Sequence, residues 1–320
     1  MRPYTRAREH LAVHQQHPMK ALITGAGGFV GQHLLRHLED QGDEVIPTDR
    51  VTDGLDILDA AALLDLFRRS APEVVYHIAG AADVGGSWQT PQATFRANAE
   101  GTLNVLWAAR EAGAERVLTI GSADVYGKVT PEDAPITEDQ PLRPVSPYAA
   151  SKVAADYVAL QATLGYGQHV VRARPFNHLG PGQTDKFVAP ALAGRVALNE
   201  LNGERVVKVG NLSPERDFTD VRDVVRAYRL LIESGHPGEV YNVCSGTAIA
   251  VQSLADQFIE MATVPMVLEP DPDLQRPVDI PLLLGDCSKL RRDTGWTPEI
   301  PLEQTLRDLL DDRRRLVRAD

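Results

Sequence analysis

The fold of this chain is decided by the stretch Ala21-Leu22-Ile23-Thr24-Gly25-Ala26-Gly27-Gly28-Phe29-Val30-Gly31. Its apolar residues run directly into a glycine turn, and an amphipathic pattern follows at once, which predicts a buried strand, a tight loop and the start of a helix. The glycines at 25, 28 and 31 let the backbone bend sharply and approach a ligand closely. The free N–H groups and positive dipole end of the helix favour an anion in the loop. We therefore expect this stretch to bind the pyrophosphate of a dinucleotide.

The composition is that of an ordinary globular protein. Of its 320 residues, 43% are apolar and 24% are charged. The net charge of −11 argues against nucleic acid or an anionic membrane as the main partner. No apolar run reaches membrane-spanning length and no signal-peptide core is visible. The two cysteines, Cys244 and Cys287, fit a reducing compartment and argue against a metal site, so we expect a cytoplasmic protein.

From Lys20 onward, strand and helix patterns alternate along the chain. Strands are expected at 20–24, 43–47, 73–78, 116–120 and 168–173, and helices at 28–40, 59–69, 91–112 and 147–164. This alternation predicts an α/β fold, a doubly wound parallel sheet of the Rossmann type with helices on both faces. Asn98 lies inside the long helical pattern, where it either supports a neighbouring strand loop or is simply exposed.

Beyond Arg174 the chain becomes rich in Pro, Gly and Asn, which indicates a smaller α/β lobe for substrate. The elements expected in this second half of the chain are a helix near 187–198, a helix at 220–233, a strand at 239–243, an extended segment at 264–286 and a charged helix at 300–318. The predicted division is a disordered leader over 1–18, a dinucleotide-binding domain over 19–175 plus about 220–245, and a substrate lobe over 176–219 plus about 246–320.

The clearest chemical signal in the sequence is the pair Tyr148 and Lys152. Their i, i+4 spacing, just after Ser146-Pro147, puts a phenol and an ammonium on one face of a helix near its start. A neighbouring cation favours the phenolate, so we expect the pKa of Tyr148 to fall toward working pH. Tyr148 is then a usable acid for a carbonyl oxygen that gains charge. The alternative is a surface helix pair without chemistry.

A second hydroxyl, Ser122, follows the predicted strand at 116–120. Open α/β sheets bind ligands at the carboxyl ends of their strands, where a hydroxyl can hold a substrate carbonyl or alkoxide. Alone, such a serine is more often a turn residue. The glycine loop, Ser122, Tyr148 and Lys152 in this order are far more specific than any one of them, and we take Ser122, Tyr148 and Lys152 as the catalytic residues.

With these residues in place, the chain resembles an extended short-chain dehydrogenase/reductase of the nucleotide-sugar branch, over nearly everything from Met19 on. Within that branch it is most similar to the GDP-4-keto-6-deoxy-D-mannose reductases. The narrower resemblance is carried by Arg174-Pro175-Phe176-Asn177-His178-Leu179-Gly180-Pro181-Gly182-Gln183, Val209-Gly210-Asn211-Leu212, Arg216-Asp217-Phe218-Thr219-Asp220-Val221-Arg222-Asp223, Gln275-Arg276-Pro277-Val278-Asp279 and Gly285-Asp286.

The resemblance implies roles for individual residues. It places Gly25, Gly28 and Gly31 at the pyrophosphate, Asp56 and Ile57 at the adenine, Ala79 and Gly80 at the cofactor ribose, and Lys152 also at the nicotinamide ribose. The further cofactor-binding residues that we infer are Phe29, Val30, Asp49, Arg50, Ala81, Asn98, Tyr148 and Pro175. The substrate-binding residues that we infer are Ser122, Asp124, Asn177, Lys186, Arg195, Arg216, Arg276 and Asp279.

Among these, Arg216 and Arg276 would clamp the substrate diphosphate and Asn177 would touch the sugar. Guanidinium groups suit phosphate because they stay charged and present paired donors. The alternative for each arginine is a surface salt bridge.

The cofactor choice is ambiguous in the sequence. Asp49, at the end of the second apolar run, would accept hydrogen bonds from a ribose diol and repel a 2′-phosphate, which favours NADH. Arg50 beside it could hold that phosphate and favour NADPH. We expect NADH or NADPH, with a slight lean to NADH or to dual use.

One position separates the reaction types of this branch. Where 4,6-dehydratases carry an acid or hydroxyl next to a glutamate, this chain has Ala123 and Asp124. Ala123 can neither donate nor accept a proton, and Asp124 is shorter than glutamate, which disfavours dehydration. We therefore predict NAD(P)H-dependent reduction of the C4 ketone of GDP-4-keto-6-deoxy-D-mannose, giving GDP-D-rhamnose or GDP-6-deoxy-D-talose.

The alternatives are a 4-epimerase with tightly bound NAD, a 4,6-dehydratase, and a dinucleotide-sensing protein without catalysis. The resemblance also implies a homodimer, paired through the helices at 91–112 and 147–164.

Overall fold

The computed structural model of the chain describes residues 18–274 and 280–319. Its main sheet has six parallel strands in the order β2-β1-β3-β4-β5-β9. The strands are β1 (Lys20–Thr24), β2 (Glu44–Thr48), β3 (Val74–His77), β4 (Arg116–Ile120), β5 (Val170–Pro175) and β9 (Val240–Val243). The strand order reverses at β1, and the crevice outside the carboxyl ends of β1 and β3 is where such sheets bind ligands.

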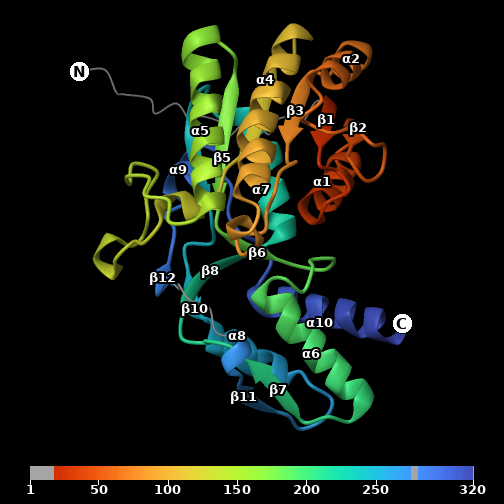
Figure 1. Ribbon diagram of the computed structural model, residues 1–320, viewed down its shortest axis with the longest axis vertical. Helices are drawn as coiled ribbons and strands as arrows, with labels where there is room; N and C mark the ends of the chain where they lie inside the picture. The colour runs from red at the N-terminus through yellow and green to blue at the C-terminus, as the bar shows by residue number, and fades with distance from the viewer. Residues whose placement is uncertain (1–17, 275–279, 320) are drawn as a thin grey trace, which may run out of the picture.

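Helices cover both faces of this sheet (Figure 1), which confirms the predicted doubly wound α/β fold. One face packs against α1 (Phe29–Asp40), α7 (Val221–Ser234) and α9 (Ser288–Thr294). The other face packs against α2 (Ala60–Ser70), α4 (Gly101–Glu111) and α5 (Pro147–Tyr166). Each face has its own buried apolar cluster, so both sides of the strands are removed from water.

The helix expected at 91–112 is interrupted. It consists of α3 (Pro91–Phe95), a π-helical turn (Arg96–Glu100) and α4. A π turn inserts one residue into the helix and re-aims the side chains within it, and such turns recur at functional sites. Here the turn points Asn98 into the protein, where only 2% of the residue is exposed.

The second half of the chain adds two smaller sheets below the first (Figure 1). In one of them β8 (Glu215–Asp220) pairs with β10 (Ala248–Ala250), β12 (Leu282–Leu283) and β6 (Asn177–Leu179). In the other, β7 (Val206–Val209) pairs with β11 (Val267–Pro270). Three helices share a separate core with the strands other than β12: α6 (Val188–Asn202), α8 (Val251–Glu260) and α10 (Leu302–Ala319).

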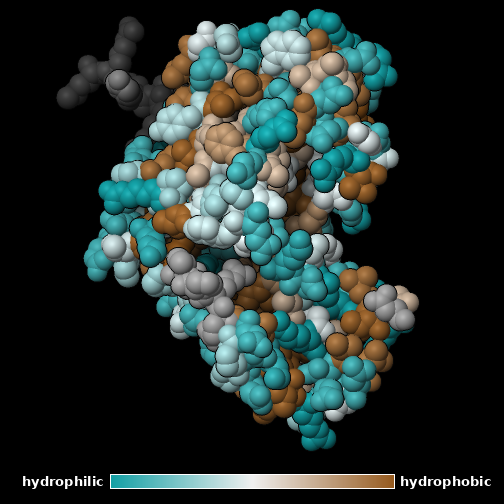
Figure 2. Space-filling model, viewed as in Figure 1, coloured by the Kyte–Doolittle hydropathy of each residue, from teal (hydrophilic) through white to brown (hydrophobic). Residues whose placement is uncertain are grey.

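Figure 2 shows the surface indented between this lower part and the body above it. The predicted domain boundaries stay a prediction. Of the predicted leader, residues 1–17 lie outside the described part of the chain. In the residues that the structure describes, no helix is both long and apolar enough to cross a membrane.

Candidate active site at the carboxyl ends of the parallel strands

The glycine turn after β1 is packed too tightly for side chains. A Cβ on Gly25 would lie 2.6 Å from the backbone nitrogen of Ala79, and Gly25 has a φ of +79°. A Cβ on Gly31 would lie 2.0 Å from the carbonyl oxygen of Gly25. Glycine is therefore required at 25 and 31, where the turn meets the loop after β3 and α1 packs onto the turn. Gly28 is the residue just before α1, so Phe29 and Val30 form the helix start at the turn.

The acidic residue predicted to meet the ribose lies beside this turn. A Cβ on Gly27 would lie 3.0 Å from the carboxyl carbon of Asp49, which follows β2 directly. One oxygen of Asp49 accepts a hydrogen bond from the Val51 backbone N–H at 2.8 Å. Within the described residues, Arg50 is exposed and no hydrogen bond or ion pair of its side chain is found. The Asp49 carboxylate thus lies beside the turn and Arg50 follows it in the chain, so the ambiguity over the cofactor persists.

Two further residues predicted for the cofactor lie before α2. Asp56 accepts a hydrogen bond from the Leu58 backbone N–H at 2.9 Å. The Ile57 carbonyl accepts one from Asn104 of α4 at 3.0 Å, and the Ile57 side chain fills the space above Gly101, where a Cβ would lie 2.5 Å from it. The segment is therefore attached to the start of α4.

Asn98 holds the loop of residues 79–81 in place. Its side-chain oxygen accepts a hydrogen bond from Ala81 N at 2.8 Å, and its nitrogen donates to Ala81 O at 3.1 Å and to the Ser151 hydroxyl at 2.8 Å. A Cβ on Gly80 would lie 2.6 Å from the Asn98 oxygen and 3.6 Å from Lys152 Nζ. Asn98 therefore supports the loop, as one of its predicted roles has it, and both of its amide hydrogens are bonded within the protein. Its predicted contact with the cofactor stays a prediction.

Next to the same loop, His77 links two threonine hydroxyls in a buried series of hydrogen bonds that the sequence did not predict. The Nδ1 atom of His77 is 2.8 Å from the Thr24 hydroxyl, and its Nε2 atom is 3.0 Å from the Thr102 hydroxyl. Burial, helped by the nearby Lys152 charge, lowers the pKa of His77 to about 3, so the ring is neutral at working pH. In the sequence, the only indication of this role is that His77 lies near the end of the strand predicted at 73–78.

Tyr148, Lys152 and Ser122 come together at the carboxyl end of β4. Tyr148 and Lys152 lie on the first turns of α5 and are almost completely buried. The Lys152 ammonium donates a hydrogen bond to the Ile120 carbonyl at 2.9 Å. Ser122 begins the 3₁₀ turn Ala123–Tyr126, and its hydroxyl is hydrogen-bonded to the Tyr148 phenol. The three groups predicted to act together therefore lie at the same end of β4.

The pKa of Tyr148 moves against the sequence prediction. Burial and the nearby Asp124 carboxylate raise it above its ordinary value, and the hydrogen bond with Ser122 only partly offsets them. Burial also lowers the pKa of the Lys152 ammonium to about 8. The prediction of a lowered phenol pKa was wrong because loss of hydration is the largest effect and the Asp124 carboxylate adds to it, although the Lys152 ammonium lies 6.0 Å from the ring centre. Tyr148 consequently keeps its proton.

The residues predicted for substrate are more dispersed. Asn177 is exposed at the start of β6, next to Pro175 at the end of β5. Lys186 reaches Asp83 in the loop after β3 at 3.4 Å, and Arg195 of α6 donates to the Lys208 carbonyl at 3.0 Å. Arg216 lies in the middle strand β8 and donates to the Glu215 carbonyl at 2.9 Å. None of these contacts joins the Ser122, Tyr148 and Lys152 group within the described residues, and Arg276 and Asp279 lie outside them.

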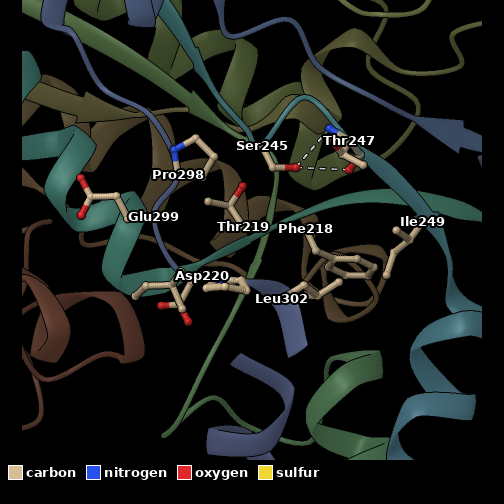
Figure 3. Close-up of a pocket in the computed structure, with 11 residues that line it drawn as sticks. Phe218, Thr219, Asp220, Ser245, Thr247, Ile249, Pro298, Glu299 and Leu302 are labelled. Atoms are coloured by element: carbon tan, nitrogen blue, oxygen red, sulfur yellow. Dashed lines mark hydrogen bonds between the residues drawn. The ribbon is translucent and has the colours of Figure 1, made fainter. Parts of the chain in front are cut away.

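A separate cavity of about 360 Å³ lies behind β8 (Figure 3). It is lined by Phe218, Thr219 and Asp220, by the loop of Ser245 and Thr247, and by the 298–302 segment. None of the predicted site residues lines it, so it lies apart from the candidate active site.

Comparison with known proteins bears on this arrangement. Residues 22–309 match the family model described as GDP-mannose 4,6 dehydratase. The chain is 37% identical to a GDP-6-deoxy-D-mannose reductase of Pseudomonas aeruginosa over 94% of this chain and 99% of that protein. It is also 31% identical to a UDP-glucose 4-epimerase of Mycolicibacterium smegmatis, over 89% of this chain and 96% of that one.

Solved structures give the same grouping. The structure of RMD from Pseudomonas aeruginosa complexed with NADPH superposes with a TM-score of 0.85 at 36% identity, covering 93% of this chain and 99% of the other. A Thermus thermophilus UDP-glucose 4-epimerase in complex with NAD has a TM-score of 0.83 at 29% identity, covering 92% and 99%. Reductases and epimerases thus share this architecture.

Proposed function

The chain belongs to the GDP-mannose 4,6-dehydratase family of extended short-chain dehydrogenases/reductases, and from this premise we propose that it is an NAD(P)H-dependent oxidoreductase of a GDP-sugar. The reaction that we propose is reduction of the C4 ketone of GDP-4-keto-6-deoxy-D-mannose to GDP-D-rhamnose or GDP-6-deoxy-D-talose. The observation that carries it is the convergence of Ser122, Tyr148 and Lys152 at the end of β4, in a chain 37% identical to a reductase of that name.

The residues around the turn fit a dinucleotide. Side chains are absent at Gly25, Gly27 and Gly80, where the backbone packs closely against its neighbours, and the Asp49 carboxylate lies beside Gly27 while the Lys152 ammonium lies near Gly80. Gly25, Gly28 and Gly31 would hold the pyrophosphate and Asp49 and Arg50 the adenosine ribose, while Lys152 would hold the nicotinamide ribose. The solved relatives carry NADPH or NAD, which supports a cofactor of this class without choosing between the two.

When bound, the reduced dinucleotide supplies the hydride. Tyr148 would give its phenol proton to the C4 oxygen as that oxygen gains negative charge. Ser122 would donate a hydrogen bond to the same oxygen, and Lys152 would stabilise the phenolate left behind. The raised pKa of Tyr148 leaves the phenol protonated, which is the state from which reduction begins. Oxidation, the first half of epimerisation, would need the phenolate instead.

The neighbours of Ser122 argue against the dehydratase alternative. Ala123 is buried and carries no proton, and Asp124, which is half-buried, is the only acidic residue of the turn Ala123–Tyr126. Dehydration needs a group at each of these positions to remove water across C5–C6. The 4-epimerase alternative uses the same three catalytic side chains, and it is kept as the second candidate because a 4-epimerase is 31% identical.

For the substrate we keep the predicted assignment. Arg216 and Arg276 would hold the diphosphate, Asn177, Ser122 and Asp124 would face the sugar, and Lys186, Arg195 and Asp279 would complete the nucleotide site. Arg216 lies on the central strand β8 of the small sheet, with β10 and β12 on either side. This fixed backbone position supports its proposed role at the diphosphate. The contact of Lys186 with Asp83 supports a cleft closed between the two parts of the molecule.

We further propose a homodimer through α4 and α5, as predicted. These helices present exposed apolar side chains, among them Leu103, Trp107, Tyr157, Leu164 and Tyr166. A hollow of about 340 Å³ between them is lined by Leu103, Trp107, Val158 and Tyr166. A contiguous apolar surface of this kind marks an interaction site. A cytoplasmic location is supported by two buried cysteines that are both free.

The test is incubation of purified protein with the 4-keto sugar, made from GDP-mannose by a separate 4,6-dehydratase, and with NADPH or NADH. We expect one equivalent of cofactor to be oxidised per sugar, with the product identified by NMR. Tyr148→Phe should lose at least 100-fold in kcat while still binding cofactor. Sugar conversion without cofactor consumption would replace this proposal by the epimerase, and direct conversion of GDP-mannose would replace it by the dehydratase.

A further inference from the structure

We infer that the guanidinium of Arg174 is a positioning group for catalysis, because it holds the segment of Ser122 against the helix that carries Tyr148 and Lys152. This inference rests on the proposed function, since it concerns the relative placement of those three side chains. Ser122 and Tyr148 belong to different elements, the turn after β4 and the first turn of α5. Their separation is therefore set by whatever joins these two elements.

On the helix side the link is Asp156. Tyr148, Lys152 and Asp156 follow one another at intervals of four residues in α5, so they lie on one face of the helix. The Asp156 carboxylate is buried and accepts a hydrogen bond from Arg174 Nη2 at 2.9 Å. It also accepts one from Arg172 Nη1 at 2.7 Å. Both arginines belong to β5 and are themselves buried.

On the other side the link is Tyr126, the last residue of the turn that Ser122 begins. Arg174 Nη1 donates to the Tyr126 hydroxyl at 3.0 Å, and that hydroxyl donates to the Asn242 side-chain oxygen at 2.7 Å. The stem of Arg174 lies directly under Gly121, where a Cβ would be 3.3 Å from Arg174 Cγ. One guanidinium thus contacts both the catalytic helix and the turn of Ser122.

The chemistry of this link suits positioning. Charge-assisted hydrogen bonds to a planar guanidinium fix direction as well as distance, and they are stronger in a buried site than in water. A displacement of about 1 Å between reacting groups can lower a rate about 100-fold. Loss of the Arg174 contacts would free the Ser122 turn while Tyr148 and Lys152 remain on an intact helix.

Arg172 provides a matched control. It pairs with the same Asp156 carboxylate from the same strand, but its second guanidinium nitrogen donates to the Gly238 carbonyl at 2.7 Å. Gly238 precedes β9 at its amino end, opposite the carboxyl ends where the candidate active site lies. Removing either arginine leaves Asp156 with one cationic partner, so the two losses are comparable in charge. The two substitutions differ in one respect: only the loss of Arg174 also removes a contact with the Ser122 turn.

The experiment compares Arg174→Met, Arg172→Met, Arg174→Lys and Tyr126→Phe in the reduction assay. For Arg174→Met we expect kcat to fall at least tenfold, while KM for the keto sugar and the NADPH dissociation constant stay within threefold. Arg172→Met should keep kcat within threefold of wild type. Its melting temperature should nevertheless fall by about as much as that of Arg174→Met. Arg174→Lys should recover part of kcat. Tyr126→Phe removes one buried hydroxyl and its two hydrogen bonds, and it should lower kcat with a smaller fall in melting temperature than Arg174→Met shows.

Each outcome decides the inference. Equal kcat losses for Arg174→Met and Arg172→Met would overturn it, because the pairing of Asp156 alone would then matter. An unchanged kcat for Arg174→Met would also overturn it. If Arg174→Met does not fold, Tyr126→Phe decides instead, and a wild-type kcat in that variant overturns the inference. A wild-type chain that does not reduce the ketone refutes the proposed function first, and the inference falls with it.

Discussion

Substitution of Gly80 by alanine should weaken cofactor binding and stability together. Gly80 lies in the loop after β3, and a Cβ there would be 2.6 Å from the Asn98 side-chain oxygen and 3.6 Å from Lys152 Nζ. An ordinary van der Waals contact begins at 3.4 Å, so the Asn98 amide would have to move about 0.8 Å away from the new Cβ. It has no room to do so cheaply, because Asn98 is buried and is held by three hydrogen bonds.

The magnitude follows from those contacts. The two bonds between Asn98 and Ala81, 2.8 Å and 3.1 Å long, would lengthen or break. Each contributes about 1 kcal/mol net, and overpacking a buried site adds about 1–3 kcal/mol. The free energy of unfolding should therefore fall by about 3–5 kcal/mol if both bonds are lost. The displaced loop and the neighbouring Lys152 both face the proposed cofactor, so we expect the NADPH dissociation constant to rise about tenfold, which corresponds to about 1.4 kcal/mol.

The assay is urea unfolding together with titration of NADPH fluorescence. Gly194→Ala is the control, because Gly194 is inside α6 and a Cβ there would meet nothing nearer than 3.9 Å. That variant should be as stable as the wild type or slightly more so, with unchanged NADPH binding. The reasoning fails if Gly80→Ala binds NADPH within twofold of wild type and unfolds at the same urea concentration.

Three further predictions follow from the same structure. Because burial lowers the folded-state pKa of Lys152 from 10.5 to about 8, the unfolded chain binds more protons between these pH values, so stability should rise with pH there by up to about 3 kcal/mol. Urea unfolding of wild type and Lys152→Met at pH 7.5 and 9.5 checks this, because the variant should lack the rise in stability. The same change in stability with pH in both proteins would contradict the prediction. Asp49→Ala should shift the ratio of NADPH to NADH efficiency toward NADPH by about tenfold, by removing repulsion of a 2′-phosphate; an unchanged ratio would remove Asp49 from the ribose site. Trp107→Glu on α4 should convert the proposed dimer into a monomer in light scattering after gel filtration, whereas a dimer that persists would place the interface elsewhere.

The first half of the fold could be predicted closely because its signals are local. The strands at 20–24 and 116–120 were predicted with the bounds that the structure has. Each is an apolar run that ends in a glycine or a polar turn, and both faces are buried, so no alternation obscures the pattern. The strand predicted at 168–173 is found at Val170–Pro175, two residues further along the chain.

The second half was harder because its strands are short and polar. The strand Glu215–Asp220 carries four charged residues out of six, yet its last four residues are buried. Asp217 is completely buried because three backbone or hydroxyl donors of Ser245 and Gly246 satisfy its carboxylate. Those donors come from a loop about thirty residues later in the sequence. A local pattern therefore could not show that this segment is a central strand.

The sequence by itself determined the parallel sheet, the glycine turn, and the presence of a phenol, an ammonium and a hydroxyl in one order along the chain. It could do so because apolar periodicity, glycine and helical spacing act over a few residues. Tertiary structure alone decided the protonation of Tyr148, the role of Asn98 and the link through Arg174. Hydration, charge and hydrogen bonding at these residues depend on neighbours brought in from distant strands, and no window of sequence contains those neighbours.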